Sequence, residues 1–106
     1  MTWTDRIVAA HTAVTDQVSH LARMKSDRYF VWQEDGANDL ETDGRHGERA
    51  VTGTTDLYTK LEFDPWKEAF EAALDSDPYI SWYLKSVQYE ETTGFTHYEW
   101  VWEVLT

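Results

Sequence analysis

The sequence predicts one α+β domain in which a mostly antiparallel four-stranded sheet packs against two helices, in the order α-β-β-α-β-β. The chain has 106 residues, which suits a single domain spanning 1–106 and is too short for two. Apolar residues recur at helical spacing near the start and again in the middle of the sequence. Residues 80–105 instead alternate apolar and polar side chains, which is typical of half-buried antiparallel strands.

The first helix is predicted over residues 4–24, because its apolar side chains follow one another at steps of three and four. Thr2 or Thr4 is expected to cap it, since either hydroxyl can accept a hydrogen bond from an amide of the first turn. The apolar stripe consists of Ile7, Val14, Val18 and Leu21, with Ala10 or His11 filling the gap.

Two strands are predicted next, at residues 29–32 and 50–60, from their β-branched and aromatic composition. The segment between them, residues 34–47, holds three glycines and many charges and has almost nothing to bury. It is therefore expected to be a long exposed loop or a hairpin arm.

A second helix is predicted to begin at Asp64 and Pro65, where Asp caps and Pro takes the first helical position. Asp77 and Pro78 end it. Its buried stripe is expected to contain Trp66, Ala69, Phe70, Ala73 and Leu74.

The end of the chain predicts a β-hairpin, with strands at 80–89 and 96–105 and a turn at 90–94 that includes Gly94. In the last strand one face is expected to be buried and the other exposed. The buried face consists of Tyr98, Trp100, Trp102 and Val104.

The charge excludes several classes of partner. Twenty acidic residues against nine basic ones give a net charge of -11, which repels nucleic acid and anionic membranes. No segment offers the roughly 20 apolar residues of a membrane span, and residues 1–6 lack the pattern of a secretion signal, so a cytoplasmic protein is expected. The absence of Cys excludes disulfides, thiolate metal sites and cysteine nucleophiles.

No catalytic, cofactor-binding or metal site is expected. His97 and Glu99 share one strand face and could bind a metal with Glu90 or Glu91, but an exposed polar face explains the same alternation. Adjacent acidic residues in turns are usually solvated, and no Gly-rich phosphate loop or nucleophile elbow occurs. The sequence therefore predicts a protein that is not an enzyme.

The aromatic residues allow two interpretations. Six Trp and six Tyr exceed what a core of this size commonly holds, and both residue types anchor protein interfaces. A sheet under two helices could instead use them all to fill its volume.

Five segments resemble small prophage proteins of the tail-terminator or tail-completion type, which take part in head-tail joining. The likeness extends over about residues 28–104 and includes the α-β-β-α-β-β order. The segments are residues 53–60, 64–66, 82–90, 93–94 and 97–101.

The resemblance implies a non-enzymatic subunit of a ring, expected to be a hexamer, that caps the tail tube and joins it to the head connector. Its partners would be copies of itself and the tail-tube and head-connector proteins, first in the host cytoplasm and then in the virion tail. The segment between the first two strands would contact neighbours or line an acidic lumen along which DNA slides. The candidate interface residues are Trp32, Asp35, Asn38, Asp39, Leu40, Glu41, Asp43, Arg45, His46 and Tyr58.

Two other functions are compatible with the sequence. A small acidic inhibitor or DNA mimic would bind a basic host protein through spaced carboxylates, as a monomer or dimer. A metal-dependent enzyme would use the face that bears His97 and Glu99.

Overall fold

The computed structural model describes residues 1–42 and 45–106, and for residues 38–42 and 45–48 it describes the backbone alone. The described residues form two helices and five strands, so the α+β class is confirmed and the predicted number of strands is wrong by one. In chain order the elements are α1 (Trp3–Thr12), β1 (Val18–His20), β2 (Arg28–Thr42), β3 (Arg45–Thr59), α2 (Trp66–Asp75), β4 (Ile80–Glu90) and β5 (Phe95–Leu105).

Helix α1 begins as one of the two predicted caps requires. The Thr2 hydroxyl accepts a hydrogen bond from the Asp5 amide, and the Asp5 carboxylate accepts one from the Thr2 amide, each at 3.1 Å. This reciprocal pair satisfies two amides at the helix start and places a negative charge at the positive end of the helix dipole.

Beyond Thr12 the predicted first helix is wrong. Val18 and Leu21 keep helical spacing, but the chain leaves the helix at residue 13 and Val18 enters strand β1. The Thr15 hydroxyl accepts a hydrogen bond from the Gln17 amide at 3.0 Å, a local bond that competes with helical pairing. Leu21 has a φ of 73°, outside the right-handed helical region.

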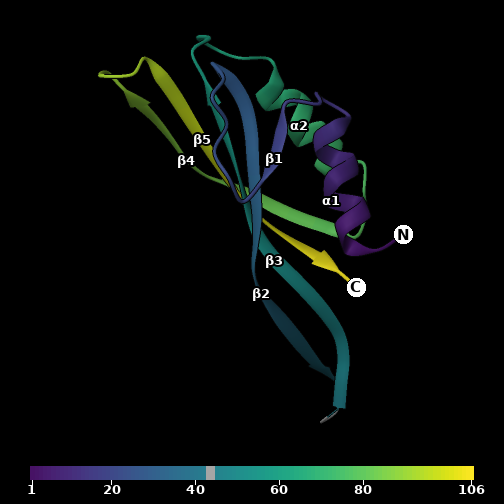
Figure 1. The fold of residues 1–106 in the computed structure, drawn as a ribbon. Helices are drawn as coiled ribbons and strands as arrows, with labels where there is room; N and C mark the ends of the chain where they lie inside the picture. Colours follow the sequence, from purple (N-terminus) through teal and green to yellow (C-terminus); the bar gives the residue numbers. More distant parts are fainter. Residues whose placement is uncertain (43–44) are drawn as a thin grey trace.

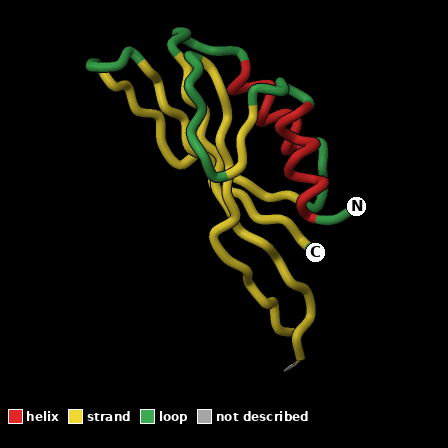
Figure 2. The backbone as a smooth tube through the Cα atoms, viewed as in Figure 1, coloured by secondary structure: helices red, strands yellow, loops and turns green. Residues whose placement is uncertain are grey.

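The five strands form one mixed sheet in the order β1-β2-β3-β5-β4. Strand β1 is the one that the sequence did not predict, and it pairs parallel to residues 30–32 of β2. All other neighbouring strands are antiparallel. Figure 1 shows both helices on the same side of the sheet, and Figure 2 shows the segment after β1 crossing the other face before β2 begins.

Strands β2 and β3 form the hairpin arm that was one of the two expectations for residues 34–47. Both strands run through this segment and are joined at residues 43 and 44. Strand β5 pairs with β3 only over residues 50–59, so the outer part of the arm is two-stranded and projects from the body (Figure 1). The molecule is consequently long and narrow, with extents of 51 × 23 × 22 Å.

Helix α2 starts one residue later than predicted, with Pro65 and not Asp64 at the N-cap position. The Asp64 carboxylate accepts a hydrogen bond from the Trp66 amide at 2.9 Å, although Pro65 lies one residue before the helix and not at its first position. The same carboxylate is buried and is held by the guanidinium of Arg28, which also lies 3.6 Å from the centre of the Trp66 ring. This cluster fixes the start of α2 to the start of β2.

The main core lies between the sheet and the two helices. The predicted inward face of β5 is confirmed, with Trp100 and Trp102 almost fully buried. Trp102 packs directly over Gly53 of β3, where a Cβ atom would lie 2.3 Å from the indole ring. The other core side chains that are fully buried are Ile7, Phe30, Leu57, Phe70, Leu74 and Val104.

Candidate interaction surfaces

The arm carries most of the residues for which an interface was predicted. Asp35 is exposed on β2, and its carboxylate accepts a hydrogen bond from the Thr52 hydroxyl at 2.8 Å. Asp43 lies outside the described residues. For Asn38, Asp39, Leu40, Glu41, Arg45 and His46 the structure describes the backbone of strands β2 and β3 and no side chain. An interface role for these residues stays a prediction.

Trp32 and Tyr58, the two other residues for which an interface was predicted, are both buried within the chain and offer little surface to a partner. An interface role for them stays a prediction. Trp32 is 6% exposed on the helix-covered face, and Tyr58 is 5% exposed on the opposite face. Arg23 covers Tyr58, because its guanidinium donates a hydrogen bond of 2.8 Å to the phenol oxygen and lies 4.8 Å from the ring centre. Burial, followed by the nearby Asp56 carboxylate, raises the pKa of Tyr58, so the phenol stays protonated.

Strand β4 is an open edge. It pairs with β5 on one side, and no described strand pairs with it on the other. An open strand edge presents unpaired amide and carbonyl groups that can pair with another chain. Three large hydrophobic side chains of β4 are more than half exposed, namely Tyr83, Val87 and Tyr89.

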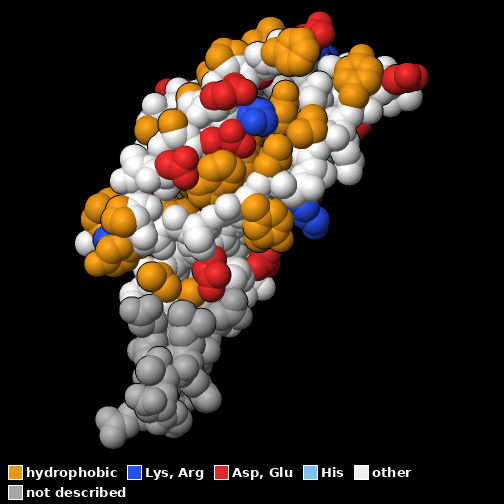
Figure 3. Space-filling model, turned by 180° about the vertical axis from the view of Figure 1, so that it is seen from behind, with side chains coloured by type: hydrophobic (Ala, Val, Ile, Leu, Met, Phe, Trp, Pro, Cys, Tyr) orange, Lys and Arg blue, Asp and Glu red, His pale blue; other side chains and the backbone are white. Residues whose placement is uncertain are grey.

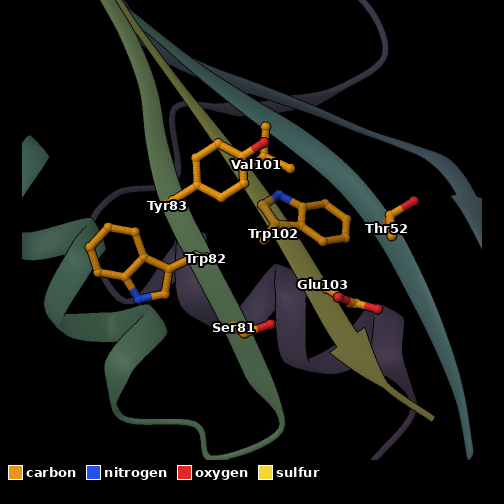
Figure 4. A pocket seen from close by; sticks show the side chains of 7 residues that line it. All are labelled: Thr52, Ser81, Trp82, Tyr83, Val101, Trp102 and Glu103. Atoms are coloured by element: carbon orange, nitrogen blue, oxygen red, sulfur yellow. The ribbon is translucent and has the colours of Figure 1, made fainter. Parts of the chain in front are cut away.

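A shallow hollow of about 190 Å³ lies beside this edge, on the sheet face without helices. Tyr83 and Val101 are register partners and lie side by side in it, with Ser81 and Glu103 further along the same strands (Figure 4). The hollow is too open for an enclosed substrate site and suits a side chain of a partner protein.

A polar cluster on the same face contains His97 and Glu99, the two residues considered above as possible metal ligands. His97 and Glu99 lie with Asp56 of β3, and one ligand atom from each falls within 4.8 Å of the others. Glu90 and Glu91 are not part of it. His97 contacts Asp56 at 2.7 Å, and Glu99 lies 3.5 Å from the Lys85 ammonium. The three groups therefore already have partners within the chain.

Sequence reasoning missed a group of exposed apolar residues at the end of the molecule opposite the arm. Phe63 is 87% exposed, and Leu61, Val87 and Tyr89 are exposed as well. Figure 3 shows hydrophobic side chains and acidic groups together at this end. Phe63 follows a predicted strand and precedes a predicted helix, a place where the sequence alone indicates only a connection.

The described helices include none that is long and apolar enough to cross a membrane. No protein-family model matches the sequence, and no curated protein matches it. Nine chains of solved structures match the fold. One belongs to the virion of a native gene transfer agent particle, with a TM-score of 0.57, 12% identity, and coverage of 96% of this chain and 89% of that chain. At this identity the match shows a shared fold and no more.

Proposed function

We propose that this protein is a non-enzymatic structural subunit of a phage-like particle, of the tail-terminator or tail-completion type, and that it assembles with copies of itself as a ring. The observation that carries the proposal is the fold likeness to a chain of a gene transfer agent virion, because it covers nearly the whole of both chains. A match over a few shared elements would carry far less, since small α+β folds serve many functions.

The sheet edges support assembly through copies of the chain. Beyond Trp32, β2 has no neighbour other than β3 among the described strands, and β4 is open along its length at the other side of the sheet. Two different open edges on one subunit allow head-to-tail contacts, which close into a ring when the rotation between subunits is suitable. Soluble monomers usually shield such edges.

The charge suits a ring through which DNA passes. A net charge of -11 repels the phosphate backbone, so DNA would slide along an acidic lumen without adhering. The expected partners are accordingly the tail-tube and head-connector proteins, and the arm would be the part that reaches a neighbour or the tube.

Native mass tests the proposal, measured by size exclusion with light scattering over a range of protein concentrations. Six chains of 12.4 kDa predict a hexamer of about 74 kDa. Tyr83→Lys places a charge beside the open edge of β4 and should prevent the ring without lowering the melting temperature, because Tyr83 is 58% exposed. Val8→Lys, at a residue of α1 that is 39% exposed, is the matched control and should leave the mass unchanged.

A monomer at every concentration would contradict the ring and favour the small acidic inhibitor. A hexamer that Tyr83→Lys leaves intact would contradict assembly through the β4 edge.

A further inference from the structure

At the end opposite the arm, two local features expose apolar side chains and a third, a hollow, lies between them. The first is Phe63, whose φ of 53° lies in the left-handed region, where a bulky side chain is strained and glycine is usual. Its ring is 87% exposed, so the strain places the side chain in water.

The second feature is an irregularity of strand β4. Its register with β5 shifts between Leu84 and Ser86, so that Val87 pairs with Tyr98 and Tyr89 with Thr96. Without this shift, Ser86 and Gln88 would lie on the helix-bearing face of the sheet, because a shift of one residue exchanges the two faces of a strand. The bulge therefore brings Val87 and Tyr89 to the helix-bearing face, where they remain 52% and 65% exposed.

The third feature is a hollow between the turn after β3 and the hairpin of β4 and β5. It measures about 400 Å³ and is lined by Lys60 and Glu62 on one side and by Tyr89 and Thr96 on the other. Leu61, 47% exposed, and Phe63 flank Glu62 in the sequence. We call the exposed side chains Leu61, Phe63, Val87 and Tyr89 the apolar end.

Uncompensated acidic groups surround the apolar end. Glu62, Glu90 and Glu91 are exposed, and within the part of the chain that the structure describes none of them forms an ion pair. Lys60, which lines the hollow, is already engaged, because its ammonium lies 3.4 Å from Asp27 and 5.1 Å from the centre of the Phe95 ring. An apolar centre with an acidic rim attracts a partner of the opposite pattern.

We propose that the apolar end is a docking surface for a different protein, one that presents an apolar side chain flanked by lysine or arginine. The same surface of a second copy is the less suitable occupant, since the exposed Glu62, Glu90 and Glu91 of one copy would then face those of the other. Val87 and Tyr89 belong to β4, whose edge the ring would use, but they lie on its helix-bearing face beyond the bulge. The decisive test uses Phe63, which lies outside β4, so this inference does not depend on the proposed function.

The probe is a short synthetic peptide in which lysine and leucine alternate, titrated into the ¹⁵N-labelled full chain and followed by amide chemical shifts. A peptide with serine in place of leucine controls for general attraction to an acidic protein. We expect the leucine peptide to shift the amides of residues 60–63 and 87–91, and the serine peptide to bind about tenfold more weakly.

Phe63→Gly provides the decisive variant. Glycine relieves the left-handed strain but makes the unfolded chain more flexible, two effects of opposite sign, so the melting temperature should stay nearly constant. Affinity for the leucine peptide should fall about tenfold. Leu21→Gly is a matched control, because Leu21 is also exposed, at 61%, and also has a positive φ, of 73°. Leu21 follows β1, which forms the opposite edge of the sheet from β4. This variant should bind normally.

Three results would overturn the proposal: shifts centred elsewhere on the molecule, equal affinity for the leucine and serine peptides, or unchanged affinity in Phe63→Gly. A change of native mass in Phe63→Gly would also overturn it, because the surface would then be a contact between copies. A monomeric wild-type protein that binds the leucine peptide as expected would refute the ring and leave this inference standing.

Discussion

Mild acid should destabilise the protein through one buried histidine. His11 of α1 is fully buried, with the rings of Phe30, Trp32 and Phe70 packed against it. Its Nδ1 lies 2.7 Å from the Ile7 carbonyl oxygen and must donate a proton to it.

The other ring nitrogen, Nε2, lies 2.9 Å from the Thr55 hydroxyl and accepts its proton. That hydroxyl oxygen in turn accepts from the Trp102 indole N–H, also at 2.9 Å. The arrangement suits only a neutral His11, because a second ring proton would leave the Thr55 hydroxyl proton without an acceptor.

Burial lowers the pKa of His11 from 6.5 to about 4, against the opposing effect of the hydrogen bond to Ile7. The unfolded chain therefore binds a proton at His11 below pH 6.5 that the folded chain does not take up until about pH 4, and the folded state loses stability as the pH falls between these values. Between pH 7 and pH 5 the loss in the free energy of unfolding is about 2 kcal/mol.

Carboxyl groups contribute little in this window. A hydrogen bond with His20 lowers the pKa of Glu34 below its ordinary value, and the bond with the Thr2 amide does the same for Asp5. A lowered carboxyl pKa gives stability that is lost only at lower pH, as the group is protonated in the folded state.

The assay is urea unfolding at pH 7, 6 and 5, followed by tryptophan fluorescence. His11→Gln removes the titrating group, so its stability should be lower at pH 7 but nearly constant down to pH 5. His20→Gln, which removes a partly exposed histidine, should keep the pH dependence of the wild type. If wild type and His11→Gln lost stability equally, His11 would not be the source of the acid sensitivity.

Two substitutions test the packing of Trp102 over Gly53 within the sheet and the ion pair that links β2 to the start of α2. Gly53→Ala should cost about 2 kcal/mol in the free energy of unfolding, because the new Cβ atom would lie 2.3 Å from the Trp102 ring and 2.5 Å from the Gln33 carbonyl oxygen. Gly36→Ala, where the nearest atom is the Thr52 hydroxyl oxygen at 3.2 Å, is its control, and equal melting temperatures of the two variants would refute the argument. Arg28→Ala should cost about 3 kcal/mol by leaving the buried Asp64 carboxylate without its guanidinium. Arg28→Lys should recover only part of this loss in chemical denaturation, since the Arg28 guanidinium donates two hydrogen bonds to the Asp64 carboxylate and a lysine ammonium cannot reproduce both. Full recovery would show that charge alone matters.

The elements with the clearest local signals were predictable from the sequence. The hairpin of β4 and β5 lies within one residue of its predicted strands, because alternation and a glycine turn are properties of adjacent residues. The start of α2 was predicted to within one residue from Asp64, whose hydrogen bond with the Trp66 amide is equally local. The deep burial of Trp100 and Trp102 followed from the same alternation.

What the sequence could not show depends on distant contacts. Strand β1 has three residues and exists only because β2 lies beside it, and nothing near Val18 indicates that pairing. The open edge of β4 follows from the order of the strands, and the burial of Tyr58 depends on Arg23, which is 35 residues away in the sequence. The exposure of Phe63 required the backbone conformation itself.

The position of β5 bears on how the chain folds. This strand follows every other element in the sequence, yet it lies inside the sheet between β3 and β4 and provides Trp100, Trp102 and Val104 to the core. Residues made earlier can form α1 and the hairpin of β2 and β3, but β4 has no described partner until β5 arrives. Such late, non-local pairing favours slow folding with a single cooperative step, so a nascent chain should stay protease-sensitive until its last strand is free to insert.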